Sequence, residues 1–204
     1  ADDHAIVRRG LKELLGEASD IEVAAEAASA QEALDCVRQQ AFDVAVLDLG
    51  LPGRGGLELL AEIKAERPAL PVLILTMQPE DQYAVRALRA GAAGYVTKES
   101  APEVLVQAVR RVAAGGRYVS PTLAEKLAEI VEGGGERDPH EALSNREFQV
   151  FRRLGAGRTV SQIAEELSLS VKTVSTYRTR ILEKMGLETN AELMRYAVRH
   201  QLVD

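Results

Sequence analysis

The sequence predicts two joined domains: an α/β domain built on a doubly wound parallel sheet, followed by an all-α domain of four helices. Up to about residue 116, short apolar runs typical of strands alternate with amphipathic helical segments. From residue 142 onward the pattern contains helices alone. Charge follows the same division, since residues 1–139 hold 15 Lys and Arg against 23 Asp and Glu, whereas residues 140–204 hold 10 against 8.

Each element of the first half has a local signal. Helical spacing of apolar residues begins at once, with no strand before it. Ser29 is a candidate N-cap, one helix stops before Pro68, and another ends at Gly91. Strands are expected over residues 21–27, 44–48, 71–76 and 94–97. Helices are expected over residues 6–15, 29–40, 57–67, 81–90 and 102–114.

The second half follows a helix and a glycine-rich linker. Residues 120–131 are expected to form the helix, and residues 133–139, with three consecutive glycines, the linker. The four helices beyond it are expected over residues 145–154, 160–167, 171–185 and 190–200. The expected domains are therefore residues 1–116, a connecting segment of residues 117–141 with one helix, and residues 142–204.

Several classes of protein are not expected from the composition. No apolar run is long enough to span a membrane and the start does not resemble a signal peptide, which favours a cytoplasmic protein. Cys36 has no cysteine partner and falls in a helical pattern, so we expect a small core residue. His4, His140 and His200 show no metal-ligand spacing, so zinc and iron sites are not expected.

The stretch from Val44 to Gly53, V-A-V-L-D-L-G-L-P-G, contains the first candidate functional residue. Asp48 ends a buried strand, and ligands of open α/β sheets bind at the carboxyl ends of the strands. By itself an aspartate before a Gly-Pro loop more often caps a turn.

Other strand ends support a functional acid. Thr76 ends one strand and Lys98 follows another, while Asp2 and Asp3 lie at the start of the chain. Clustered carboxylates repel one another unless a cation compensates them, and an all-oxygen site suits Mg²⁺. Asp48 could then act as a nucleophile that forms an aspartyl phosphate.

Residues 1 to about 115 resemble the receiver domain of two-component response regulators. The resemblance is carried by the acidic pair, by D-L-x-L-P-G, by Thr76 and by G-A-A-G-Y-V-T-K. It implies a five-stranded, flavodoxin-like sheet, whose first strand is missing from the chain as given. Glu99 departs from the family, since many receivers have proline after the lysine.

The resemblance also implies a role for each residue of the site. Asp48 is expected to accept the phosphoryl group, Lys98 to pair with its oxygens, and Thr76 to donate a hydrogen bond to it. Tyr95 is expected to act as a switch that rotates inward after Thr76 moves. The expected Mg²⁺ ligands are Asp2 through water, Asp3, Asp48 and the carbonyl of Gly50.

Residues 160–185 fit a helix-turn-helix arrangement, with a second helix that is apolar on one face and hydroxyl-rich and basic on the other. Such a helix by itself is more often a solvated hairpin. However, L-S-x-R-E, Gly157, Ile163-Ala164 and T-V-x-x-Y-R resemble the LuxR-type (NarL/FixJ) DNA-binding domain. The expected DNA contacts are Lys172, Thr173, Ser175, Thr176, Arg178, Thr179, Arg180 and Lys184.

Together these features predict a transcription factor that is switched by phosphorylation of Asp48. Its expected partners are a sensor histidine kinase, double-stranded promoter DNA, RNA polymerase and a second copy of the chain, through the last helix or the receiver. No enzymatic turnover is expected beyond self-phosphorylation and slow dephosphorylation. Two alternatives remain: a DNA-binding regulator that ignores phosphate, and an aspartyl-phosphate phosphatase, which would need an acid where Gly50 stands.

Overall fold

The computed structural model describes residues 1–51, 55–100, 102–133 and 138–203. The chain divides into two compact units, residues 1–133 and 134–204, which we describe separately. Helix α6 (Pro121–Gly133), which we expected in the connecting segment, falls in the first unit. The expected loop residues Pro52 and Gly53, and the linker residues 134–137, lie outside the described residues.

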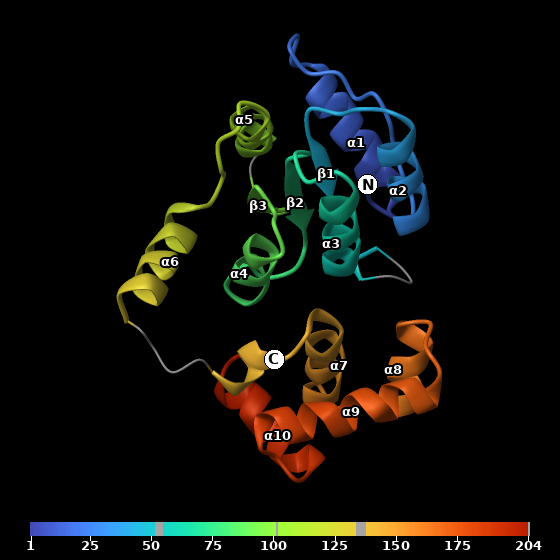
Figure 1. The fold of residues 1–204 in the computed structure, drawn as a ribbon, viewed down its shortest axis with the longest axis vertical. Coiled ribbons are helices and arrows are strands. Elements are labelled where there is room, and N and C mark those ends of the chain that lie inside the picture. The colour runs from blue at the N-terminus through green and yellow to red at the C-terminus, as the bar shows by residue number, and fades with distance from the viewer. Residues whose placement is uncertain (52–54, 101, 134–137, 204) are drawn as a thin grey trace. The chain divides into compact units, whose positions relative to one another are not determined.

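The first unit contains a parallel sheet in the order β1-β2-β3 (Figure 1). Its strands are β1 (Ala45–Leu47), β2 (Val72–Thr76) and β3 (Gly94–Thr97). Leu47 lies opposite Ile74, and Leu75 lies opposite Val96. All five residues of β2 are buried, as expected for a central strand that is covered on both faces. The sheet confirms the predicted α/β class.

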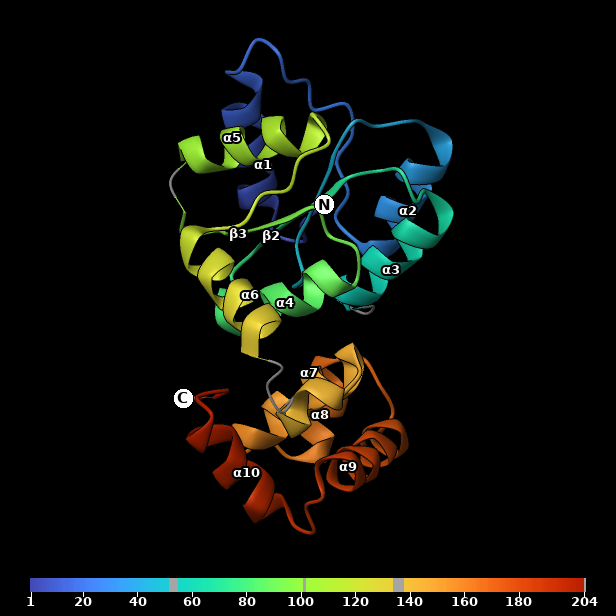
Figure 2. The same cartoon turned by 60° about the vertical axis from the view of Figure 1, so that its left-hand side comes forward.

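Helices cover both faces of this sheet (Figures 1 and 2). On one face, α1 and α5 pack against Leu73, Leu75 and Val96. On the opposite face lie α3 and α4, with α2 packed beside α3. The bounds are α1 (Ala5–Gly16), α2 (Ala30–Gln39), α3 (Gly56–Glu66), α4 (Glu80–Arg89) and α5 (Pro102–Ala113). Ser29 caps α2 as predicted, because its side chain accepts a hydrogen bond from the Glu32 amide.

The strand predicted over residues 21–27 is not confirmed. This segment carries no strand assignment, although Ile21 and Val23 pack against the hydrophobic core beside the sheet. A strand requires a ladder of backbone hydrogen bonds to a neighbour. At the end of this segment, the Ala27 carbonyl accepts a hydrogen bond from the Asp2 amide (3.0 Å). The Ala1 carbonyl accepts another from the Asp48 amide (2.9 Å). The start of the chain therefore lies between Ala27 and Asp48.

The segment after α5 returns to the sheet. Tyr118 forms a parallel bridge with Gly94, and the amide of Tyr95 donates to the Tyr118 carbonyl (3.1 Å). Helix α6 then packs on α4, where Ser120 hydrogen bonds to Glu80 (2.8 Å). These contacts explain why residues 117–133 belong to the first unit.

The second unit is helical, as predicted, and each of its four main helices begins at a side-chain cap. Ser144, Thr159, Ser170 and Thr189 each accept a hydrogen bond from the third residue that follows. Its elements are a short 3-10 helix η1 (Pro139–Ala142), α7 (Asn145–Gly155), α8 (Val160–Glu166), α9 (Val171–Met185) and α10 (Asn190–Arg199). Across the described parts of both units, no helix combines the length and apolar character that crossing a membrane requires.

Candidate functional site

Asp48 lies directly after β1, at the carboxyl edge of the sheet, and is buried. Its Oδ1 accepts a hydrogen bond from the amide of Gly50 (2.9 Å). Space here is tight, because a side chain on Gly56 would approach the Leu49 Cα to 2.4 Å. The first turn of α3 therefore packs on the backbone that holds Asp48.

Lys98 brings two of the predicted acids together. Its Nζ lies 2.5 Å from Asp48 Oδ2 and 2.6 Å from Asp2 Oδ2. Burial by itself lowers the pKa of Lys98, but the two carboxylates outweigh it and raise the pKa above its ordinary value. The ammonium is therefore protonated and compensates part of the negative charge at the sheet edge.

The structure assembles three of the predicted Mg²⁺ ligands and one residue that we did not predict. Asp2, Asp3, His4 and Asp48 each place a ligand atom within 4.8 Å of the others. Asp2 Oδ2 and Asp3 Oδ1 are both buried, and each lies in an ion pair, with Lys98 Nζ at 2.6 Å and His4 Nδ1 at 2.9 Å respectively. Buried oxygens of this kind are costly unless a cation or water satisfies them. His4 could have been found from the sequence, since it directly follows the acidic pair.

Thr76 and Tyr95 lie on neighbouring strands at the same edge. Thr76 ends β2 and is buried, and its Oγ1 accepts a hydrogen bond from the Gln78 amide (3.3 Å). Tyr95 is only 1% exposed, and its hydroxyl donates to the Gln78 carbonyl (2.9 Å). The structure therefore places Tyr95 in the inward position, and its rotation on phosphorylation stays a prediction.

The second unit contains the predicted helix-turn-helix. Helix α8 leads through a turn, in which Ser168 has the positive φ of 53°, into α9. Arg146 of α7 fixes this turn because its Nη2 donates to the Leu167 carbonyl (3.2 Å). The apolar face expected on α9 comprises Val174, Tyr177, Ile181 and Met185, of which all but the half-buried Tyr177 are buried.

The opposite face of α9 is available to a ligand. Two exposed hydroxyl groups donate to their own helix, from Thr176 to the Lys172 carbonyl (3.0 Å) and from Thr179 to the Ser175 carbonyl (3.2 Å). Thr173 is half-buried, and its Oγ1 lies 2.7 Å from Ser170 Oγ. The exposed members of the predicted set are Lys172, Ser175, Thr176, Thr179, Arg180 and Lys184.

Two of the predicted DNA contacts have structural partners. Arg178 is half-buried and its Nε donates to Asn190 Oδ1 (2.6 Å). Lys184 Nζ lies 2.7 Å from Oε2 of Glu147, which is buried. These interactions join α9 to the start of α10 and to α7, and no local sequence pattern predicts either of them.

Part of the apolar face of α10, the helix expected to contact a second copy of the chain, is buried inside the unit. Leu193 and Ala197 are fully buried within the unit, against α7. Met194 and Val198, which lie four residues apart and so share a face, are 39% and 58% exposed. These two residues are available to a partner.

Fold and site together define a class of protein. A parallel sheet that gathers aspartates, a lysine and a hydroxyl group at its carboxyl edge, joined to a helix-turn-helix unit, is the architecture of a DNA-binding regulator with a receiver domain. Comparison with known families agrees. Residues 1–110 match the response regulator receiver domain, and residues 141–197 match the bacterial regulatory proteins of the luxR family.

Individual proteins share this arrangement along the whole chain. The response regulator GacA of Pseudomonas aeruginosa is 38% identical over 204 residues, which are 100% of this chain and 95% of that protein. The response regulator UvrY of Escherichia coli K12 is 36% identical over 202 residues, or 98% and 93% of the two chains.

A solved structure resembles the chain over nearly the same length. RcsB from Salmonella enterica serovar Typhimurium, bound to promoter rprA with the phosphomimetic BeF3-, is 26% identical with a TM-score of 0.66, over 96% of this chain and 94% of that one. The chain therefore belongs to the response regulator family, in the group with a LuxR-type DNA-binding domain, and is a DNA-binding transcription regulator. Response regulators interact with a kinase and with promoter DNA, and their receivers generally bind Mg²⁺ at the phosphorylation site.

Proposed function

We propose that Asp48 accepts a phosphoryl group from a partner sensor histidine kinase and that this reaction controls binding of promoter DNA by α9. The observation that carries the proposal is the bridge from Lys98 to the buried carboxylates of Asp2 and Asp48. A buried acid at a strand end, beside a fixed cation, is suited to nucleophilic attack and to stabilising the charge that results.

The transfer is a displacement at phosphorus. A carboxylate oxygen of Asp48 attacks the phosphorus of phosphohistidine, and the O–P bond forms as the P–N bond breaks. The electron pair of the P–N bond goes to the imidazole nitrogen, which takes up a proton from solvent. Lys98 pairs with the phosphoryl oxygens, and the hydroxyl of Thr76 donates a hydrogen bond to them. Water later hydrolyses the acyl phosphate, so no free substrate is turned over.

Asp2, Asp3, Asp48 and the Gly50 carbonyl would hold Mg²⁺ in this proposal. The carboxylate oxygens of Asp2, Asp3 and Asp48, which lie within 4.8 Å of one another, fit such an ion, since oxygen atoms are the ligands it prefers. When bound, the ion would balance the charge of the carboxylates and of the phosphoryl group.

On the DNA side, we propose that α9 enters the major groove. Thr176 and Thr179, with Ser175 beside them, would contact base edges, while Lys172 and Arg180 neutralise phosphates. Thr173, Arg178 and Lys184 are assigned a smaller share, because Thr173 is half-buried and the other two already hold Asn190 and Glu147.

Two further partners belong to this proposal. A second copy of the chain would pack on Met194 and Val198 of α10, which doubles the DNA contacts. RNA polymerase would then be engaged at the promoter, and the protein would act in the cytoplasm, where that DNA lies.

A second candidate is a regulator whose DNA binding ignores phosphate and whose receiver serves as a dimerisation module. One observation favours it: Tyr95 is held in the inward position by a hydrogen bond from its hydroxyl to the Gln78 carbonyl (2.9 Å). A phosphatase is not favoured, because Gly50 occupies the place of the second acid.

The deciding experiment measures affinity for a genomic promoter pool with and without a Mg²⁺-dependent phosphodonor. We compare the wild type, Asp48→Asn, and Asp43→Asn, which makes the same change at an exposed aspartate near the other end of β1. The phosphodonor is expected to label the wild type and Asp43→Asn and to tighten their binding to DNA. It is expected to do neither for Asp48→Asn. Equal affinity in all six conditions would establish the second candidate, and full labelling of Asp48→Asn would refute the assignment of Asp48.

A further inference from the structure

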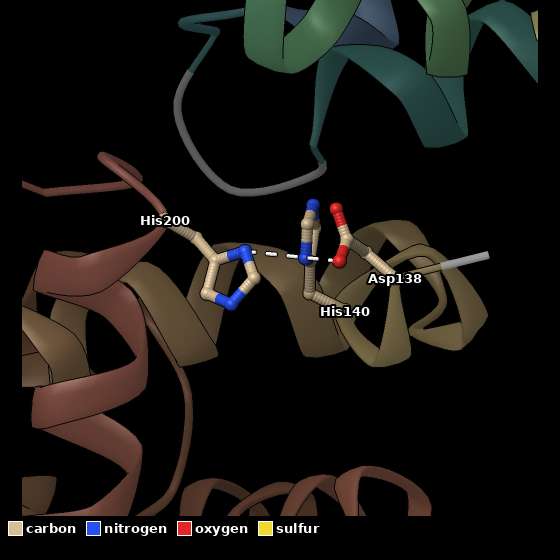
Figure 3. Close-up of side chains that lie close together, drawn as sticks. All are labelled: Asp138, His140 and His200. Atoms are coloured by element: carbon tan, nitrogen blue, oxygen red, sulfur yellow. Dashed lines mark ion pairs between the residues drawn. The ribbon is translucent and has the colours of Figure 1, made fainter. Parts of the chain in front are cut away.

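The second unit contains a cluster of potential metal ligands of its own, formed by Asp138, His140 and His200 (Figure 3). Asp138 precedes η1, His140 belongs to η1, and His200 caps the end of α10. One ligand atom from each side chain lies within 4.8 Å of the other two. His140 and His200 are 60 residues apart in the chain, so no ligand spacing in the sequence predicts the cluster.

Aromatic packing holds both imidazole rings in place. The His200 ring stacks on Tyr196, with centroids 4.1 Å apart and 19° between the planes. The His140 ring stacks on Phe148 at 6.1 Å, and its Nδ1 lies 2.9 Å from the Tyr196 hydroxyl. Metal-binding histidines are commonly oriented by a hydrogen bond of this kind. Much of the entropy cost of ordering the two rings is therefore already met in the folded unit.

The distances fit an ion between the three groups. His200 Nδ1 is 3.7 Å from Asp138 Oδ1, which is too long for a direct hydrogen bond. Ligands about 2.0–2.1 Å from a tetrahedral zinc ion lie roughly 3.3 Å from one another. Each pair of ligand atoms therefore has to come closer by about 1.5 Å at most, which rotation of the side chains can supply. The side chains of His200 and Asp138 are 29% and 49% exposed, which lets an ion enter from solvent.

The donor atoms of this cluster favour a different ion from the one that the acids of the receiver favour. Two imidazole nitrogens and one carboxylate oxygen suit Zn²⁺, Ni²⁺ or Cu²⁺, whereas oxygen-only sites suit Mg²⁺. We propose that Asp138, His140 and His200 form a transition-metal site of the zinc type, with water in the remaining position. A bound ion would clamp the chain that enters the second unit to the end of α10, and so stabilise this unit without taking part in phosphorylation.

Calorimetric titration of the full chain with ZnCl₂, in excess Mg²⁺, tests the proposal. The wild type is expected to bind one zinc ion, and Asp138→Asn and His200→Gln are each expected to lose this event. His4→Gln is the matched control, because it removes the histidine that lies among the acids of the receiver and should leave zinc binding intact. Circular dichroism verifies that each variant is folded.

Thermal unfolding gives a second readout. Zinc is expected to raise the melting temperature of the wild type and of His4→Gln but not of His200→Gln. Asp138→Asn and His200→Gln should still take up phosphoryl groups on Asp48, so this test is independent of the function proposed above. The site would be refuted if the wild type did not bind zinc, if Asp138→Asn and His200→Gln bound zinc as well as the wild type does, or if only His4→Gln lost zinc binding. The three side chains would then form only an aromatic cluster with an ion pair.

Discussion

Glu147 is a buried carboxylate whose partners come from two helices. Burial raises the pKa of its carboxyl group, but hydrogen bonds from Lys184 and Ser144 outweigh burial and lower the pKa below its ordinary value of 4.5. The unfolded chain therefore takes up a proton at a higher pH than the folded one. It follows that Glu147 contributes stability above pH 4.5, which is lost as the pH falls through the lowered pKa.

Glu147→Gln should flatten this acid response. Between neutral pH and pH values below 4.5, the free energy of unfolding of the variant is expected to fall less than that of the wild type. Urea unfolding followed by circular dichroism at several pH values measures the difference. Glu183→Gln, an equal change at an exposed position of α9, should retain the wild-type response. If the Glu147 and Glu183 variants show the same slope, the role assigned to the Lys184 contact is wrong.

Helix α9 is the element that should separate recognition of sequence from general affinity. Thr179 is exposed in the middle of the helix and Lys172 lies in its first turn. Thr179→Ala is expected to alter the preference at one or two base pairs by about 1–3 kcal/mol. Lys172→Ala is expected to weaken binding to all sequences alike and to reduce the slope of log affinity against log salt concentration by about one.

A selection of binding sites from random DNA, with affinities at several salt concentrations, measures both effects for the α9 variants. Glu183→Gln is again a suitable control, since it lies on α9 outside the predicted contacts. Uniform loss of affinity in both Thr179→Ala and Lys172→Ala would show that the base-reading face has been chosen wrongly.

Elements differed in how far the sequence could predict them. The helices of the second unit were predicted well because each has a local signal, a capping residue followed by apolar residues at helical spacing. The strand over residues 21–27 is not confirmed, because an apolar pattern does not specify a neighbouring strand for it to pair with. The pairing of Tyr118 with Gly94 is likewise a nonlocal contact, which no local sequence pattern predicts.

The acidic site was predictable for a different reason. Parallel strands end at one edge, so Asp48, Thr76 and Lys98 could be brought together from strand order alone. In contrast, the Lys184 contact with Glu147 and the approach of His140 to His200 depend on how helices pack, which the sequence does not state. The inward position of Tyr95 is also a property of packing.

For the whole chain, the boundary at residue 133 makes a prediction about fragments. Residues 1–133 keep Tyr118 beside β3 and the buried side chain of Leu123 in α6, whereas a fragment of residues 1–116 loses both. Burying a leucine contributes about 1.5–3 kcal/mol. We therefore expect the free energy of unfolding of the shorter fragment to be lower by at least this amount, so that it unfolds at a lower urea concentration. The longer fragment is expected to unfold at the same urea concentration as the first unit of the full chain.

The comparison needs one further variant, because any shortening of a chain can destabilise it. Leu123→Ala in the fragment of residues 1–133 should account for much of the difference between the two fragments. If residues 1–116 and 1–133 unfold at the same urea concentration, α6 is not part of the first unit.

The pairing of Tyr118 with β3 also bears on self-association. A strand at the end of a sheet presents unpaired amide and carbonyl groups, which readily pair with another chain. Here the amide of Tyr95 donates to the Tyr118 carbonyl, and the Tyr118 amide donates to the Ala93 carbonyl. The segment that leads toward the DNA-binding unit thus shields the last strand, and a regulator cut before Tyr118 would expose a surface that favours aggregation.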